Sequence, residues 1–117
     1  MAHGRANRQG GLVKRGDIVF VDFDPTLGRE QAGARPALVL SPESFNRLTG
    51  LAMLVPITRR VRNIPFEVQL TGTRTLGVAL CHQSRTIDTR ARRCKFVERV
   101  PESVVAEALA KVRAILA

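Results

Sequence analysis

Apolar residues along this chain fall into short runs separated by turn residues, and a longer amphipathic stretch follows them. Short runs bounded by Gly, Pro, Asp, Asn or Ser are typical of strands that end in turns. One run, at residues 66–70, alternates apolar and polar positions, as a strand with one solvent-exposed face does. The pattern predicts six strands, at residues 17–22, 36–41, 51–57, 66–70, 77–81 and 94–98.

The last stretch of the chain predicts one long helix over residues 101–116. Pro101 suits the first helical position, and the carboxylate of Glu102 complements the positive end of the helix dipole. Apolar residues recur at three- and four-residue steps, so they form one stripe along the helix. The stripe contains Val104, Val105, Ala108, Leu109, Val112, Ile115 and Leu116.

Three shorter features interrupt the strand pattern. Residues 42–46 predict a short helical turn, with Ser41 as its N-cap and Pro42 at the first helical position. Pro56 lies near the end of the third strand and predicts an edge position or a bulge, because proline cannot donate a ladder hydrogen bond. The polar segment 83–93 predicts a short helix or turn.

The strands and the terminal helix together predict an α+β protein that is mainly β. We expect a small, mostly antiparallel, barrel-like sheet with a C-terminal amphipathic helix packed on it. A length of 117 residues suits one domain. Residues 1–14 lack periodicity and are rich in Gly and charge, which predicts a flexible basic N-terminal arm ahead of a domain over residues 15–117.

The formal net charge is +9, and it is not confined to the N-terminal arm. The first fifteen residues contribute four cations and no acid, so +9 less these four leaves +5 for residues 16–117. A basic folded body favours a polyanionic partner, nucleic acid or an acidic protein, and plain solubility charge is the alternative. With five Phe and no Trp or Tyr, the chain lacks the aromatic platforms of base-stacking RNA-recognition modules.

The cysteines and acidic residues do not indicate a metal site. Cys81 and Cys94 have no metal-ligand spacing and suit buried thiols in a reducing cytosol. Asp22 and Asp24 lack a third ligand at a useful spacing, so we expect neither metal nor cofactor. No apolar run approaches the length of a membrane span, and the N-terminus has no apolar signal-peptide core. We therefore expect a cytoplasmic protein without a membrane partner.

The polar stretch between the first two predicted strands, residues 28–36, holds the densest candidate chemistry. Gly28 and Gly33 favour a loop, which also carries the side chains of Arg29, Glu30 and Gln31. Arg35 is followed by a proline, which biases its backbone toward the extended conformation of a strand. A guanidinium held at the start of a strand suits work on a phosphate or carboxylate. The alternative is a structural ion pair with Asp17, Asp22 or Glu30.

Four segments of the chain resemble motifs of the MazF/PemK endoribonuclease toxins. Residues 15–25 and 28–40 are similar to the N-terminal signature of that family, with its Gly-x-Glu-Gln-x-Gly-x-Arg-Pro run. Residues 55–58, Val-Pro-Ile-Thr, resemble the third-strand motif that ends in Thr or Ser. Residues 83–88 resemble the segment Gln-x-Arg-Thr/Ser-Ile-Asp. The resemblance extends over about residues 15–117.

This resemblance implies an SH3-like barrel of the MazF/CcdB/Kid type and a homodimer. It also implies a ribosome-independent toxin that cuts single-stranded RNA at a short sequence without metal, so that translation and growth are inhibited. Its expected partner is a small antitoxin whose acidic, disordered C-terminal segment occupies the RNA groove. Arg35 and Thr58 match the family's catalytic positions. Positions in or beside the RNA site are matched by Glu30, Gln31, Gln83 and Arg85.

Metal-free RNA cleavage requires three tasks of the side chains. The 2′-hydroxyl must lose its proton, the crowded phosphorane charge must be stabilised, and the leaving 5′-oxygen must be protonated. Arg35 suits the second task, because the guanidinium fork contacts two phosphate oxygens. The hydroxyl of Thr58 can hold a non-bridging oxygen or orient the 2′-hydroxyl.

Two residues are candidates for the general base. Glu30 would serve if burial raised its pKa, although Arg29 and Arg35 beside it would lower that pKa. His82 is the only histidine beyond the N-terminal arm and adjoins Gln83, but a lone histidine is usually a bystander.

The remaining candidates concern RNA binding and the competing functions. The three cations that follow Thr58, namely Arg59, Arg60 and Arg62, suit a phosphate track, a row of side chains that binds the RNA phosphates. The alternative is that they form an ordinary solvated surface. The wider set of predicted RNA-binding residues is Arg29, Gln31, Arg59, Arg60, Arg62, Gln83 and Arg85. The competing functions are a nucleic-acid-binding barrel without chemistry and a non-catalytic toxin that, like a related barrel family, jams DNA gyrase.

Overall fold

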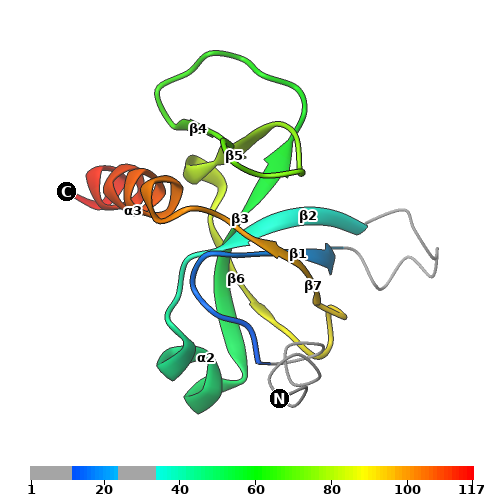
Figure 1. The fold of residues 1–117 in the computed structure, drawn as a ribbon. Coiled ribbons are helices and arrows are strands. Elements are labelled where there is room, and N and C mark those ends of the chain that lie inside the picture. The colour runs from blue at the N-terminus through cyan, green and yellow to red at the C-terminus, as the bar shows by residue number, and fades with distance from the viewer. Residues whose placement is uncertain (1–11, 24–33) are drawn as a thin grey trace.

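The computed structural model describes residues 12–23 and 34–117 (Figure 1). Its elements, in chain order, are the strands β1 (Asp17–Asp22) and β2 (Ala34–Val39), helix α2 (Glu43–Thr49), strands β3 (Leu51–Thr58), β4 (Glu67–Gln69) and β5 (Val78–Leu80), the 3-10 turn η2 (Cys81–Gln83), strands β6 (Arg85–Asp88) and β7 (Lys95–Arg99), and helix α3 (Glu102–Leu116).

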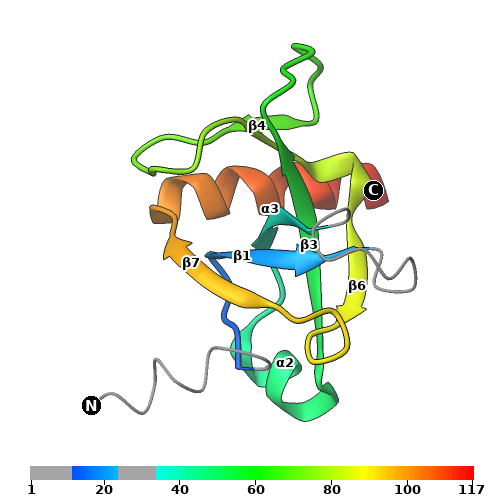
Figure 2. The ribbon, with the colours of Figure 1, turned by 90° about the vertical axis from the view of Figure 1, so that its right-hand side faces the viewer.

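The strands form one antiparallel sheet in the order β4-β5-β3-β2-β1-β7. The long strand β3 lies at its centre and also pairs with β6, which is off this path. In Figure 2, α3 runs across the molecule with β4 on one side and β1 and β7 on the other. The predicted fold class, a mostly antiparallel sheet with a C-terminal helix, is confirmed.

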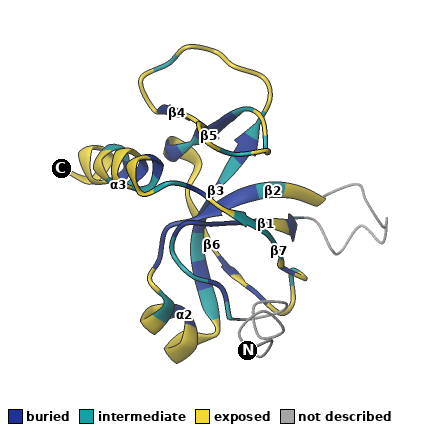
Figure 3. Cartoon of the chain, viewed as in Figure 1, coloured by how far each residue is buried: buried dark blue, intermediate teal, exposed yellow. Residues whose placement is uncertain are grey.

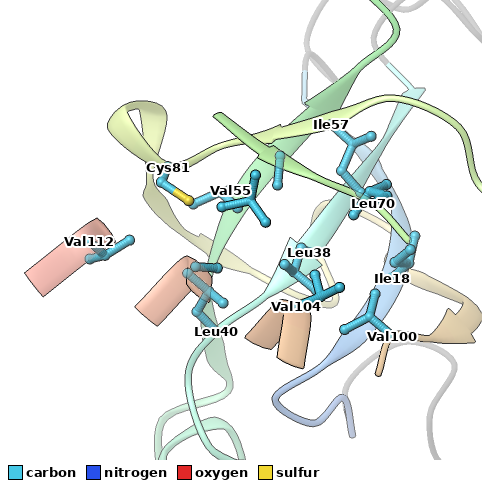
Figure 4. Packing of buried hydrophobic residues seen from close by; sticks show 13 residues of the cluster. Ile18, Leu38, Leu40, Val55, Ile57, Leu70, Cys81, Val100, Val104 and Val112 are labelled. Atoms are coloured by element: carbon cyan, nitrogen blue, oxygen red, sulfur yellow. The ribbon is translucent and has the colours of Figure 1, made fainter. Parts of the chain in front are cut away.

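Two apolar clusters make up the core, one against each face of the central strands. The first cluster lies between the sheet and α3, and it includes Ile18, Leu38, Val55 and Val104 (Figure 4). The second cluster includes the alternate strand residues, such as Val19. Burial therefore concentrates in β1, β2 and β3 (Figure 3). Because both faces of these strands are covered, their sequences are continuous apolar runs.

The position of Pro56 differs from the predicted edge or bulge. It lies in the central strand β3, paired with Ala37 of β2 on one side. On the other side, residues 51–54 pair with β6 and residues 57–58 pair with β5. Pro56 falls between these two partners, where no ladder hydrogen bond is required of its nitrogen. The register shift in the pairing of β1 with β7 lies elsewhere, between Ile18 and Val19.

The short helix is longer than predicted, and its cap is different. Helix α2 extends to Thr49, and Gly50, in the left-handed region at φ 75°, ends it. Pro42, not Ser41, is the N-cap residue. The Ser41 hydroxyl instead donates to Asn46 Oδ1 at 2.5 Å and accepts from the Met53 backbone N–H. Its hydrogen bonds join the helix to β3 rather than capping the first turn.

Other boundaries moved by small amounts. The second strand begins and ends two residues earlier than predicted. The segment 83–93 contains strand β6, which was missed, as well as a turn. In α3, the residues Val104, Ala108 and Val112 of the predicted stripe are buried, whereas Ile115 and Leu116 are exposed because the helix extends past the core.

The start of the packed body lies before residue 15. Val13 is fully buried in the second cluster, and its carbonyl accepts a hydrogen bond from Asn46 Nδ2 at 2.8 Å. The rest of the predicted arm, residues 1–11, lies outside the described residues. Within the described residues, no helix is long and apolar enough to cross a membrane.

Both cysteine thiols are free and buried, as predicted. Burial raises the pKa of Cys81 to about 11 and that of Cys94 to about 12. A thiol with such a pKa is almost entirely protonated near neutral pH, and the thiolate is the reactive form. These residues act as small apolar groups of the two clusters.

Candidate functional site

A cavity of about 510 Å³ opens at the end of the central strands. Three segments line it: Phe20 with residues 35–36, residues 57–59 at the end of β3, and residues 74–76 in the loop between β4 and β5. Arg35 and Thr58, the two candidate catalytic residues, therefore share one cavity. Of the predicted phosphate track, Arg59 lines it as well.

Pairing between β2 and β3 explains why Arg35 and Thr58 meet. Ala37 is opposite Pro56, and extending this register by two residues places Arg35 opposite Thr58. Directly opposed residues of an antiparallel pair project on the same face of the sheet, with Cβ atoms about 4.5–5.5 Å apart. On its other side Arg35 pairs with Val21 of β1, so the guanidinium is carried by a strand that is paired on both sides.

Arg35 and Thr58 have few polar partners among the described residues. The guanidinium of Arg35, which is exposed, makes no hydrogen bond or ion pair with a described residue. Thr58 Oγ1 accepts the backbone N–H of Arg60 at 3.1 Å, which leaves its own O–H available to a ligand. One alternative partner of Arg35, Asp17, is buried and pairs with Arg99 at 2.9 Å.

The loop at residues 71–77 closes one side of the cavity, and Gly77 sets its distance from Thr58. Gly77 has φ +122°, and a Cβ there would lie 2.2 Å from the Thr58 carbonyl oxygen. Only glycine tolerates both the dihedral angle and this close approach. The end of the loop therefore packs directly on the backbone of the candidate catalytic threonine.

Glu98 of β7 holds the middle of the same loop. Its carboxylate accepts the backbone N–H of Arg74 at 3.1 Å, the backbone N–H of Thr75 at 2.8 Å and the Thr75 hydroxyl at 2.6 Å. Burial raises the pKa of Glu98, but these hydrogen bonds and the charge of Arg74 outweigh it, so the pKa lies below its ordinary value. Sequence reasoning missed Arg74, Thr75 and Glu98, because residues 71–74 read as an ordinary turn.

The basic loop after β3 is held in a similar way. Glu67, which is buried, accepts the backbone N–H groups of Arg62 at 2.9 Å and Asn63 at 3.0 Å. Arg59, Arg60 and Arg62 are exposed. Their guanidiniums have no hydrogen-bond or ion-pair partner in the part of the chain that the structure describes. This loop presents cations to solvent on one side of the cavity.

His82 and Gln83 lie in η2 and do not line the cavity of Arg35 and Thr58. Both side chains are exposed. The imidazole of His82 packs against the Phe66 ring, with centroids 6.0 Å apart and planes tilted by 43°. His82 does not share the cavity of Arg35 and Thr58, and its role as the base stays a prediction.

Arg85 lies over an aromatic ring at the end of β1. Its Cζ atom is 4.9 Å from the centroid of Phe23, a cation–π distance. Arg92 Nη1 donates to the carbonyl of the same phenylalanine. Phe23 is the last described residue before residues 24–33, and both Arg85 and Arg92 contact it.

The other predicted site residues, Arg29, Glu30 and Gln31, lie outside the described residues. Among residues 12–23 and 34–117, no group of three or more His, Cys, Asp or Glu residues could hold a metal ion. In the described part of the site, the available groups are guanidiniums, hydroxyls and backbone amides. These groups can bind an anion and stabilise charge that develops on phosphate oxygens.

Comparison with known proteins adds to this geometry. Residues 14–116 match the family model of the PemK-like, MazF-like toxin of type II toxin–antitoxin systems. The chain is 44% identical over 119 residues to Endoribonuclease PemK of Escherichia coli, which covers 97% of this chain and 90% of that protein. It is 53% identical over 77 residues to the Endoribonuclease toxin MazF of Escherichia coli strain K12, covering 66% and 69%.

Solved structures agree with the sequence relatives. The crystal structure of MazF from Deinococcus radiodurans superposes with a TM-score of 0.80 at 40% identity, covering 90% of this chain and 96% of that chain. A crystal structure of MazE-MazF from the same organism gives a TM-score of 0.78 at 36% identity, covering 90% and 95%.

Proposed function

The chain belongs to the PemK-like, MazF-like toxin family of type II toxin–antitoxin systems and is an endoribonuclease toxin, and we propose that it cuts single-stranded RNA at the cavity that Arg35 and Thr58 share. The observation that carries this proposal is the convergence of the two side chains on one cavity from adjacent strands. A guanidinium without a partner among the described residues, beside a hydroxyl that can donate, is suited to a phosphodiester.

The proposed reaction uses the RNA as its own nucleophile. The ribose 2′-hydroxyl loses its proton and attacks the adjacent phosphorus, the bond to the 5′-oxygen breaks, and that oxygen takes up a proton. The products are a 2′,3′-cyclic phosphate and a 5′-hydroxyl, and no metal is required. Arg35 stabilises the charge on the phosphorane oxygens, a contribution worth about 3–4 kcal/mol for one preorganised donor. Thr58 donates to a non-bridging oxygen or orients the 2′-hydroxyl.

Two residues remain candidates for the base in this proposal. Glu30 precedes Arg35 by five residues in the sequence, and His82 lies on η2. A general base contributes typically 10²- to 10⁴-fold to the rate and imposes its own pKa on the acid limb of the pH profile. Glu30→Gln and His82→Gln are therefore compared through the pH dependence of cleavage, and the variant that abolishes the acid limb identifies the base.

RNA recognition is assigned to the basic surface around the cavity. The phosphate backbone would be contacted by the exposed residues of the loop after β3, Arg59, Arg60 and Arg62. Arg29 and Arg85 would add positive charge. Base edges of a short recognition sequence would be read through the amides of Gln31 and Gln83, because hydrogen bonds rather than stacking suit a chain with so few aromatic residues.

An antitoxin is the protein partner that the comparisons support. Structural neighbours include MazE-MazF complexes from Deinococcus radiodurans. We propose further that an acidic, disordered C-terminal segment of the antitoxin occupies the basic cavity and folds as it binds. We propose that the protein is a homodimer in the cytoplasm. There it would cut mRNA and so inhibit translation and growth.

The test is cleavage of a long single-stranded RNA by the purified full-length protein in excess EDTA, with end-group analysis of the fragments. The expected result is discrete cuts with 2′,3′-cyclic phosphate ends, which Arg35→Ala abolishes. Arg113→Ala is the matched control, since it removes one exposed arginine of α3 that does not line the cavity. Cleavage that survives Arg35→Ala, or that stops in EDTA, would overturn this mechanism.

A further inference from the structure

We propose that Arg74 is a second phosphate-binding residue of this site, and that Glu98 is the residue that positions it. The inference rests on the proposed function, because it assumes that RNA enters the cavity of Arg35 and Thr58. Arg74 lines that cavity from the loop at residues 71–77, which connects β4 to β5. It would bind a phosphate next to the one that Arg35 holds.

The bonding of Glu98 is the first step of the argument. A carboxylate near an arginine usually pairs with the guanidinium. Here it accepts the backbone N–H of Arg74 and both the N–H and the hydroxyl of Thr75 instead. The guanidinium of Arg74 has no hydrogen-bond or ion-pair partner among the described residues and is exposed. Glu98 thus orders the backbone that carries the cation and leaves the cation itself available to a ligand.

The ends of the loop are also held. Gly72 has φ +70°, and a Cβ there would lie 2.9 Å from Pro101 Cγ. Gly77 packs against the carbonyl oxygen of Thr58. The loop is therefore held at both ends and in the middle by residues distant in sequence. A loop so fixed holds Arg74 in one place relative to Thr58, and the entropy cost of binding a phosphate falls when the binding group is already ordered.

Charge makes the roles of the two residues distinguishable. Replacing Glu98 by Gln removes one negative charge, which by long-range electrostatics alone would strengthen binding to RNA. Our inference predicts the opposite, because the amide accepts backbone N–H groups less strongly than a carboxylate and loosens the loop that carries Arg74. In an Arg74→Ala background, the same Glu98→Gln change should no longer weaken binding.

The experiment measures binding of a single-stranded RNA that wild-type protein cuts, made with 2′-O-methyl riboses so that it cannot react, at several salt concentrations. We expect Arg74→Ala to weaken binding roughly tenfold, the loss of one charge-assisted contact, and to reduce the steepness of the salt dependence by about 0.7, the value for one single-strand phosphate. Arg113→Ala is the matched control for charge. On unmodified RNA, Arg74→Ala should raise KM far more than it lowers kcat.

The outcomes separate this inference from the proposed function. If wild-type protein leaves RNA intact, the proposed function fails. If wild-type protein cuts RNA but Arg74→Ala binds like Arg113→Ala, the role of Arg74 is overturned. Tighter binding by Glu98→Gln, or an equal loss with and without Arg74, would overturn the positioning role. Should Glu98→Gln fail to fold, Thr75→Val replaces it, because this change removes the hydroxyl donor to Glu98 and keeps every charge. It should weaken RNA binding where Arg74 is present and leave binding unchanged in the Arg74→Ala background; an equal loss in both backgrounds would overturn the positioning role.

Discussion

The cavity of Arg35 and Thr58 differs from the segment at residues 82–88 in what its polar side chains contact. In the cavity, the guanidinium of Arg35 has no partner among the described residues. In the 82–88 segment, His82 packs on Phe66 and Arg85 lies over Phe23. Motifs that together resemble one RNA site thus fold into two environments. In the first environment a guanidinium is available to an anionic ligand, whereas in the second the imidazole and the guanidinium already contact aromatic rings.

The largest difference between the two regions is expected for their threonine hydroxyls. Thr58→Val should lower single-turnover cleavage about 10²-fold, the effect of removing one preorganised donor from the reacting oxygens. Thr86→Val is the isosteric control in β6, at an exposed position that does not line the cavity. It should change the rate by less than about threefold, as surface substitutions usually do. Equal effects of the two changes would remove the distinction between the regions.

The next largest effect concerns the glycine that packs on Thr58. Gly77→Ala should lower the free energy of unfolding by about 1–3 kcal/mol for the positive φ alone, and by more through the collision with the Thr58 carbonyl oxygen. Gly50→Ala is its control, because Gly50 also has positive φ but a Cβ there would meet no atom within 4 Å. Urea unfolding measures both, and an equally small loss for the two variants would contradict the close approach at Thr58.

A smaller effect is expected for the contact between Arg85 and Phe23. A double-mutant cycle of Arg85→Ala and Phe23→Leu should give a coupling of about 0.5–1 kcal/mol in the free energy of unfolding, as for a cation over an aromatic ring near the surface. Urea unfolding of the two single variants and the double variant supplies the cycle. Additive single effects would mean that the contact does not stabilise the protein, and would leave Arg85 available for RNA alone.

The smallest effects follow from two carboxyl groups, one in each region. Hydrogen bonds from the backbone N–H groups of Ala91 and Arg90 lower the pKa of Asp88 from its ordinary value of 3.8. Burial raises the pKa of Glu98, but hydrogen bonds from the Thr75 hydroxyl and from the backbone N–H groups of Arg74 and Thr75 together lower it by more, so it lies below its ordinary value of 4.5. A carboxyl whose folded pKa is depressed stabilises the protein above its unfolded pKa, and this stability is lost as the pH falls through the folded value.

Asp88→Asn and Glu98→Gln should therefore be less stable than wild type at neutral pH, and the differences should shrink on acidification below the ordinary values of 3.8 and 4.5. Urea unfolding at several pH values measures this. Only Glu98→Gln is expected to alter RNA binding, since Glu98 holds the loop that carries Arg74 into the cavity, whereas Asp88 caps a local turn. A stability difference that persists in acid would mean that the charge of the carboxylate is not what matters.

The sequence by itself determined the strand and helix pattern, the family and the two candidate catalytic residues. Periodicity located β1, most of β3 and α3, because apolar spacing reports which residues of a regular element can be buried. The proline after Arg35 predicted an extended backbone there, and Arg35 does lie in β2. Properties of this kind depend on neighbouring residues, so they can be inferred before the fold is known.

Only the tertiary structure decided which distant residues meet. Pro56 is tolerated in a central strand because β5 and β6 pair with β3 on either side of it. Glu98 holds Thr75 across 23 residues of sequence, and Val13 joins the core beneath Asn46. No local pattern encodes these contacts, since they depend on how the sheet closes. The arrangement of Arg35, Thr58 and Arg74 around one cavity follows from the same long-range pairing.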